Sequence, residues 1–198
     1  MNTSGLGISQ LKAVLRLDFY RYDGAESWGQ CIRAYLREPG IRFTFWLRVS
    51  AWLRKGRLKR LMFPFAWFMC NHYEIKFGFS VPTSTQIGPG LYFSHFGGIV
   101  VNGRATIGRN CNIGHGVTVG QSNRGKHKGY PSIGDNVFIG PGAKIFGAVH
   151  IGSGAAIGAN AVITSDVPEG AVVGGIPARI ISMEGSQGYI EWTLDLSS

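Results

Sequence analysis

The chain has 198 residues, of which 44% are hydrophobic and 16% charged, and this suffices for one domain with a substantial extension. Its three cysteines are odd in number and lack C-x-x-C spacing, which argues against a disulfide framework and against a cysteine zinc site. Most of the net charge of +9 lies in residues 1–76, which hold 13 Lys and Arg against 5 Asp and Glu. General nucleic-acid binding by the rest of the chain is therefore not expected.

The N-terminal third is predicted to be helical, because apolar residues in positions 9–38 follow helical spacing with a break at Asp23 and Gly24. The chain starts without a basic stretch followed by an apolar run, so we expect no secretory signal and a cytoplasmic protein. Segment 41–70 alternates large aromatic residues with basic ones. It is interpreted either as helix packed on the next region or as an interfacial segment at the inner face of the cell membrane, where anionic lipid would meet Arg54, Lys55, Arg57, Lys59 and Arg60.

A six-residue repeat follows, in which an aliphatic or aromatic residue returns at every sixth position, with two interruptions. Period six fits neither an α-helix nor a plain strand. It fits short strands joined by glycine-rich corners, three of which close a triangular turn of 18 residues. Stacked turns bring the repeated side chains into inward columns. The thirteen inward positions are Val81, Ile87, Phe93, Val101, Ile107, Ile113, Val119, Ile133, Ile139, Ile145, Ile151, Ile157 and Ile163.

These patterns predict a mainly β chain with three parts. Residues 1–77 form a helical region, residues 78–181 a solenoid with an inserted loop at 121–132, and residues 182–198 a tail. The first interruption, between Phe93 and Val101, lengthens the spacing to eight residues and contains His95. Gly97 and Gly98 follow it and allow backbone to approach a ligand closely. A repeat that is broken at a histidine indicates a functional site.

The segment IGPGAKIFGAVHIGSGAAIGANAVIT, followed by GGIPARII, resembles the hexapeptide-repeat acyltransferases, whose fold is a left-handed parallel β-helix. More narrowly, GLYFSHFGGIVV, GVTVG, PSIGDNVFIGPGAKIFG and GGIPAR are similar to the serine acetyltransferase group and its relatives that O-acetylate bacterial surface polysaccharides. The resemblance implies a homotrimer with active sites between neighbouring prisms, acetyl-CoA as the donor and a histidine general base. Two such trimers could also pair through the N-terminal helices.

The resemblance places the general base at His95, which stands in HFGGIV where the family has H-x-x-G-I-V. An imidazole with a pKa of about 6.5 can take the proton of a hydroxyl as the oxygen attacks the thioester, without a covalent enzyme intermediate. Backbone N–H groups near Gly120 are candidate oxyanion donors, and Glu74 is a candidate to orient the imidazole. We expect His115 and His150 to be surface residues.

On the donor side, Ala143, Lys144 and Arg179 match family positions near the coenzyme A groove, and both basic side chains could meet phosphates. The inserted loop must project from the prism, and its basic residues could meet phosphates or an anionic acceptor. Candidate acceptor or loop contacts are Tyr92, Ser94, Phe96, Lys126, His127, Lys128 and Tyr130.

The acceptor is inferred from departures from the serine acetyltransferase pattern. Ser94 stands where those enzymes have an aspartate, Ser80 where they have a second one, and Gly129 and Tyr130 where they have arginine and histidine. A buried amino-acid zwitterion needs a counter-charge at each end, whereas a sugar hydroxyl does not. The main prediction is therefore O-acetylation of a capsule, exopolysaccharide or lipopolysaccharide unit. The alternative within the family is the serine O-acetyltransferase of cysteine biosynthesis.

Two interpretations from other classes compete with the enzyme. A three-histidine zinc site of the carbonic-anhydrase kind needs closely spaced histidines, and the histidines here are 23, 20, 12 and 23 residues apart, so no metal is predicted. A non-catalytic β-helix scaffold is also compatible with a repeat alone. The bulge at His95 and the inserted loop argue against it.

Overall fold

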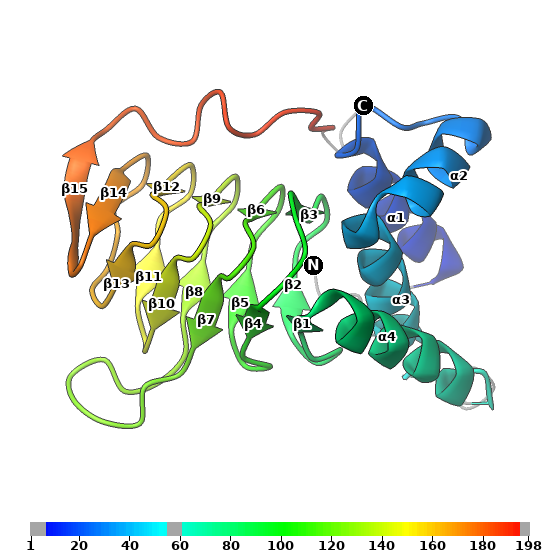
Figure 1. Cartoon of the computed structure of the whole chain (residues 1–198), viewed down its shortest axis with the longest axis horizontal. Helices are drawn as coiled ribbons and strands as arrows, with labels where there is room; N and C mark the ends of the chain where they lie inside the picture. Colours follow the sequence, from blue (N-terminus) through cyan, green and yellow to red (C-terminus); the bar gives the residue numbers. More distant parts are fainter. Residues whose placement is uncertain (1–6, 55–60, 195–198) are drawn as a thin grey trace.

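The computed structural model describes residues 7–54 and 61–194 of the chain. In this part, four helices form the N-terminal region and lie across one end of a long β-prism (Figure 1). The helices are α1 (Ile8–Tyr20), α2 (Trp28–Arg37), α3 (Pro39–Leu53) and α4 (Phe63–Phe77).

Local sequence signals explain where the helices begin and end. The predicted break between α1 and α2 is confirmed, since Asp23 and Gly24 have φ angles of 55° and 65°, which end the first helix. Ser27 caps α2 by accepting a hydrogen bond of 3.3 Å from the backbone of Gln30. Pro39 opens α3 in the first turn, where a missing N–H costs nothing.

The prism is a left-handed parallel β-helix, as predicted, and its three faces are three sheets of short strands. The first sheet holds β1 (Phe79–Ser80), β4 (Ile99–Val101), β7 (Thr118–Gly120), β10 (Lys144–Phe146) and β13 (Val162–Ile163). The second holds β2 (Gln86–Ile87), β5 (Thr106–Ile107), β8 (Ser132–Ile133) and β11 (His150–Ile151). The third holds β3 (Tyr92–Phe93), β6 (Asn112–Ile113), β9 (Phe138–Ile139), β12 (Ala156–Ile157), β14 (Val172–Gly175) and β15 (Ala178–Ser182).

The register of the strands turns the six-residue repeat into a continuous core. Lys144 pairs with Val162, and Phe138 with Ala156, so one turn of the prism takes 18 residues. All thirteen predicted inward positions are buried. Each fully buried aliphatic side chain contributes about 1.5–3 kcal/mol, and stacking therefore stabilises coils that could not bury these side chains alone.

A buried ion pair joins the helices to the first coil. The carboxylate of Asp18 is fully buried and accepts a 2.8 Å hydrogen bond from Arg48 Nε, and it also accepts from the backbone N–H groups of Gly90 and Leu91. The guanidinium of Arg48 donates two further bonds of 2.6 Å to the carbonyls of Ile87 and Gly88. Every charged atom of the pair thus has partners, which is the condition under which buried charges are tolerated.

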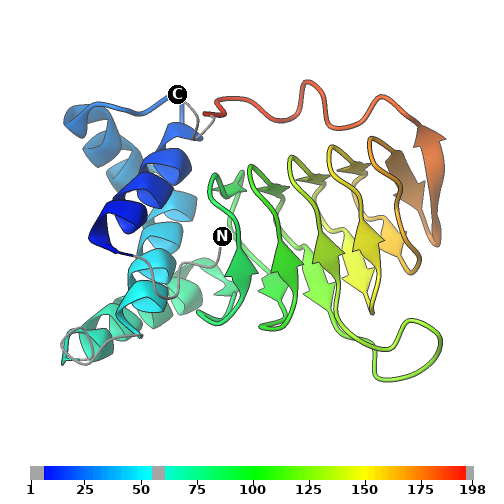
Figure 2. The same ribbon diagram turned by 180° about the vertical axis from the view of Figure 1, so that it is seen from behind.

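The chain after β15 runs back along the prism to the helices, as both views show (Figures 1 and 2). Ser186 donates its N–H to the Gly154 carbonyl, and the ring of Tyr189 stacks on Phe138 with centroids 4.4 Å apart. Arg21 Nε then donates to the Glu191 carbonyl at 2.9 Å. This strap ties the far end of the prism to α1 and its following turn.

The predicted membrane segment 41–70 is only partly described. Within it, Trp46 contacts Phe65, while Phe65 and Phe68 on α4 remain exposed. Residues 55–60, with Lys55, Arg57, Lys59 and Arg60, lie outside the described residues. In the described part of the chain, no helix has the length and apolar character needed to span a bilayer. Contact with a membrane surface therefore stays a prediction.

Candidate active site

His95 lies in the corner between β3 and β4, where the chain carries two residues more than a regular corner. Gly97 and Gly98 have φ angles of 109° and 65°, a region that side chains other than glycine rarely adopt, so this corner depends on glycine. The backbone of Gly97 accepts a hydrogen bond of 2.8 Å from the N–H of Gly116 in the next coil. The bulge is therefore anchored while the side chain of His95 stays exposed.

The next coil brings a second histidine to this corner. The rings of His95 and His115 have centroids 6.0 Å apart and meet edge to face at 66°. The sequence separation explains the contact, because 20 residues are one 18-residue turn plus the two extra residues of the bulge. Both side chains are exposed at one edge of the prism, which we call the histidine corner.

Glu74, the candidate orienting carboxylate, has a different partner. It lies near the end of α4, and its Oε1 accepts a 2.9 Å hydrogen bond from the N–H of Val81. Partial burial raises the pKa of this carboxyl, an effect that the Val81 bond opposes. Within residues 7–54 and 61–194, no carboxylate contacts the ring of His95.

The three candidate acceptor contacts around the bulge differ in exposure. Phe96 is exposed, with its ring 5.6 Å from that of Phe77. Ser94 is half-buried. Tyr92 packs against the helices rather than standing free beside His95, since its ring lies 4.8 Å from that of Tyr22 and burial raises the pKa of its phenol.

The inserted loop occupies a different corner, between β7 and β8, which we call the loop corner (Figure 1). Ser122 and Gly129 pair as an antiparallel bridge at the base of the loop, and Lys126 and Lys128 are exposed. The carbonyl of His127 accepts from the N–H of Ala148 at 2.8 Å. Within one chain, strands β4 and β7 separate this corner from His95, so the two corners do not share a site.

Tyr130, at the end of the loop, holds an arginine. Arg104 donates a 2.9 Å hydrogen bond to the Tyr130 hydroxyl, and its guanidinium carbon lies 5.4 Å from the centroid of the same ring. Arg104 is exposed, so its remaining donors face solvent. This places a positive charge at the loop corner, close to where the family pattern has an arginine and this chain has Gly129.

The candidate coenzyme A contacts lie on different parts of the prism. The ammonium of Lys144 donates to the Gly116 carbonyl at 2.5 Å and to Thr118 Oγ1 at 3.2 Å, and Ala143 is fully buried. Arg179 is exposed on β15, where it donates to the Ala178 carbonyl. Gly120 is the last residue of β7, where the inserted loop begins, so it lies at the loop corner and not at the histidine corner.

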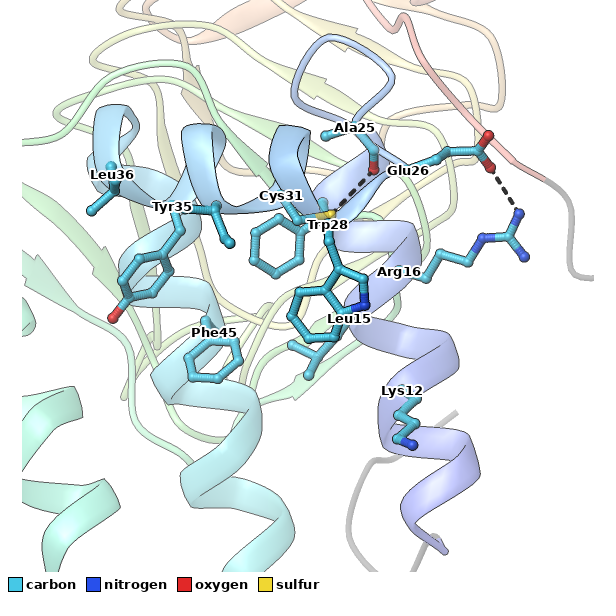
Figure 3. Close-up of a pocket in the computed structure, with 12 residues that line it drawn as sticks. Lys12, Leu15, Arg16, Ala25, Glu26, Trp28, Cys31, Tyr35, Leu36 and Phe45 are labelled. Atoms are coloured by element: carbon cyan, nitrogen blue, oxygen red, sulfur yellow. Dashed lines mark hydrogen bonds and ion pairs between the residues drawn. The ribbon is translucent and has the colours of Figure 1, made fainter.

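A cavity of about 430 Å³ lies in the helical region, away from both corners (Figure 3). Apolar side chains from α1, α2 and α3 line it, among them Leu15, Trp28 and Phe45. An ion pair of 2.7 Å between Arg16 and Glu26 closes one edge. None of the residues that line the cavity is a histidine, so an imidazole base is sought at the histidine corner.

Comparison with known proteins identifies the family. Models of the bacterial transferase hexapeptide (six repeats) and of the hexapeptide repeat of succinyl-transferase match residues 130–165 and 104–121. The serine acetyltransferase of Mycobacterium tuberculosis is 35% identical over 158 residues, which cover 79% of this chain and 67% of the relative. That of Helicobacter pylori J99 is 34% identical over 149 residues, which cover 74% and 83%. The chain belongs to the serine acetyltransferase family.

Solved serine acetyltransferases have the same architecture. The enzyme from Brucella abortus in complex with coenzyme A superposes with a TM-score of 0.73 at 30% identity, covering 88% of this chain and 69% of that one. The enzyme from Neisseria gonorrhoeae in complex with serine gives 0.72 at 32% identity, covering 88% and 70%. This member of the family is accordingly an acyltransferase that uses acetyl-CoA, as the sequence predicts.

The predicted polysaccharide acceptor is wrong, because the relatives and structures that match this chain are serine acetyltransferases. The error came from treating Ser94, Gly129 and Tyr130 as a loss of the charges that an amino acid needs. A counter-charge is defined by its place in space, and Arg104 reaches the loop corner from a different coil. The predicted carbohydrate partner is wrong for the same reason.

Two residues that sequence reasoning passed over stand at the corners. The sequence predicts His115 to be a surface residue without a role. It follows His95 by 20 residues, which is one 18-residue turn plus the two extra residues of the bulge, and this spacing already places the two histidines at the same corner of neighbouring coils. Arg104 has no such signal, since its contact with Tyr130 depends on how the loop folds back. Among the described residues, no three His, Cys, Asp or Glu side chains come together as a metal site.

Proposed function

We propose that the chain is a serine O-acetyltransferase, which moves the acetyl group of acetyl-CoA to the hydroxyl of serine. The observation that carries the proposal is the match over 88% of the chain to serine acetyltransferase structures, one of them in complex with coenzyme A and another with serine. The exposed imidazole of His95 in a glycine corner supplies the group that the reaction needs.

In the proposed mechanism His95 is the general base. Its ring nitrogen takes the proton of the serine hydroxyl while the oxygen attacks the thioester carbon, and a tetrahedral oxyanion forms. Collapse of this intermediate breaks the carbon–sulfur bond, and the leaving thiolate takes the proton back from the imidazolium. No group of the protein forms a covalent bond, and the protonation state of the enzyme is restored.

Serine also needs partners for its two charges. Arg104, fixed by Tyr130, is proposed to hold the carboxylate, since a guanidinium presents paired donors to a carboxylate. Because Arg104 and His95 occupy different corners of one prism, a single chain cannot bring both to one small molecule. We therefore propose a homotrimer in which the loop corner of one subunit faces the histidine corner of its neighbour, with Lys126, His127 and Lys128 beside the entering substrates.

On the donor side, Arg179 is proposed to meet phosphates of coenzyme A, because it is exposed and its only side-chain bond in the described part of the chain is to its neighbour Ala178. Lys144 is proposed as a contact of the pantetheine arm near Gly116, where its ammonium already lies. The other proposed contacts of this arm are backbone groups at Ala143 and Gly120.

The test is product identification. Purified protein is incubated with acetyl-CoA and serine, free thiol is followed with time, and O-acetylserine is identified by mass spectrometry, with His95→Ala as the blank. The proposal predicts equal amounts of thiol and O-acetylserine from the wild-type chain and neither from the variant. Thiol release without O-acetylserine, or no release with serine at any concentration, would show that serine is not the acceptor.

A further inference from the structure

The histidine corner contains a second imidazole, that of His115, whose ring nitrogens make no hydrogen bond to any described residue. The backbone of His115 is fixed, because its carbonyl accepts a 2.8 Å hydrogen bond from Gly142 N–H and the following Gly116 donates to Gly97. Within residues 7–54 and 61–194, its side chain has a ring contact with His95 and no hydrogen bond or ion pair. By contrast, the ring of His150 on the second sheet is hydrogen-bonded to Ser132 at 3.0 Å.

The spacing of the two rings leaves room for a substrate atom. A direct N–H···N bond needs nitrogens about 3 Å apart, and centroids separated by 6.0 Å keep the ring nitrogens farther apart than that. The rings can instead each meet a different oxygen of the reaction, that of the acceptor hydroxyl and that of the thioester. Two exposed imidazoles at this separation therefore form a cradle for reacting oxygens.

Two other candidate donors of the chain are partly engaged or lie at a different corner. The ammonium of Lys144 uses two of its three donors on the Gly116 carbonyl and on Thr118 Oγ1. Gly120, the expected oxyanion donor, lies at the loop corner, at the other end of β7. Among the described residues, His115 is the histidine whose ring contacts that of His95, and no hydrogen bond engages its ring nitrogens.

We propose that His115 is a second catalytic residue, which donates its ring N–H to the thioester oxygen as that oxygen becomes the oxyanion. The inference rests on the proposed acetyl transfer with His95 as base. When the acceptor oxygen bonds to the acetyl carbon, the carbonyl electron pair moves onto the thioester oxygen, where the His115 N–H meets it. His115 neither gains nor loses a proton in the cycle, so the roles of base and donor are divided between the two rings.

The test compares His115→Ala, His115→Gln, which keeps a side-chain N–H donor, and His150→Ala as a matched surface control. Because a side-chain oxyanion donor contributes about 10²–10³ in kcat, His115→Ala should lose that much while its KM values and melting temperature stay close to wild type. His115→Gln should recover part of the loss, and His150→Ala should match wild type. A kcat for His115→Ala within about threefold of wild type, or a change confined to KM, would overturn the proposal.

A second reaction separates this inference from the identity of the acceptor. Slow hydrolysis of acetyl-CoA by water at high enzyme concentration passes through the same oxyanion without serine. If wild-type protein hydrolyses acetyl-CoA but forms no O-acetylserine, the proposed acceptor fails, and a slower hydrolysis by His115→Ala still supports the donor role. Equal hydrolysis by the two proteins, including none by either, would overturn it.

Discussion

Two polar clusters of this chain contrast in what they do with charge. At the junction of helices and prism, Asp18 and Arg48 are 0% and 3% exposed, and their charged atoms are saturated by each other and by backbone groups. At the histidine corner, His95 and His115 are exposed, and their ring nitrogens make no hydrogen bond within the described residues. The charged groups of the first cluster are hydrogen-bonded within the protein and stabilise the fold. The ring nitrogens of the second cluster remain available to bind a ligand.

The contrast is sharpest for His95, where we expect the largest effect. Because a positioned base contributes about 10²–10⁴ in rate, His95→Ala should lower kcat for O-acetylserine formation by that factor. Its side chain is exposed and packs against little, so the melting temperature should be unchanged. Steady-state kinetics measure kcat, and thermal unfolding measures the melting temperature. A His95→Ala protein with wild-type activity would show that another residue is the general base.

Asp18→Ala should have the opposite signature. Removing the carboxylate leaves Arg48 buried without its counter-charge, which costs about 3–5 kcal/mol of unfolding free energy. Denaturant unfolding measures the loss. The control is Glu26→Ala, which breaks an exposed pair with Arg16 and should cost less than about 1 kcal/mol. Equal losses in the two variants would mean that the junction does not stabilise the chain as described.

Arg104→Ala extends the comparison to the loop corner, where the guanidinium of Arg104 is hydrogen-bonded to Tyr130 and also exposed to solvent. We expect the KM for serine to rise by about 10-fold to 100-fold, since a charge-assisted pair contributes about 1.5–3 kcal/mol. Arg109→Ala, which removes an exposed arginine paired with Asp135, should leave the KM unchanged. If neighbouring subunits share sites, a trimer that contains both His95→Ala and Arg104→Ala subunits holds some sites with an intact His95 and an intact Arg104. Co-expression of the two variants should therefore restore activity at low serine, and no restoration would contradict the shared site.

Glu74→Gln should have the smallest effect. Burial raises the pKa of Glu74 in the folded chain, so folding favours its protonated form, and the resulting stability is present at low pH and lost as pH rises through the folded-state pKa. Glutamine keeps an oxygen for the Val81 N–H without the charge. The variant should therefore match wild type at low pH and equal or exceed its melting temperature at neutral pH. A large fall in kcat would instead show that Glu74 orients His95.

The prism could be predicted from the sequence because its geometry repeats locally. Each side of a coil takes six residues, so an inward position such as Ile139 is followed by the next one six residues later. The sequence also placed His95 in an irregular corner, since the bulge disturbs that count, and the role of His95 as the base stays a prediction. It could not reveal the strap at Tyr189 or the Asp18 network, which depend on contacts between segments far apart in the chain. The contact between Arg104 and Tyr130 also joins different coils, so a comparison of the sequence with the family pattern, made position by position, could not show it.

The most direct test of this account is to measure the acetylation rate and the melting temperature of His95→Ala and Asp18→Ala side by side, with the rates taken at a temperature where both variants are folded. The account predicts that His95→Ala loses its rate and keeps its melting temperature, whereas Asp18→Ala loses melting temperature and keeps most of its rate per folded molecule. The reverse pattern, or a joint loss in both variants, would contradict the division between a buried, hydrogen-bonded junction and an exposed histidine corner.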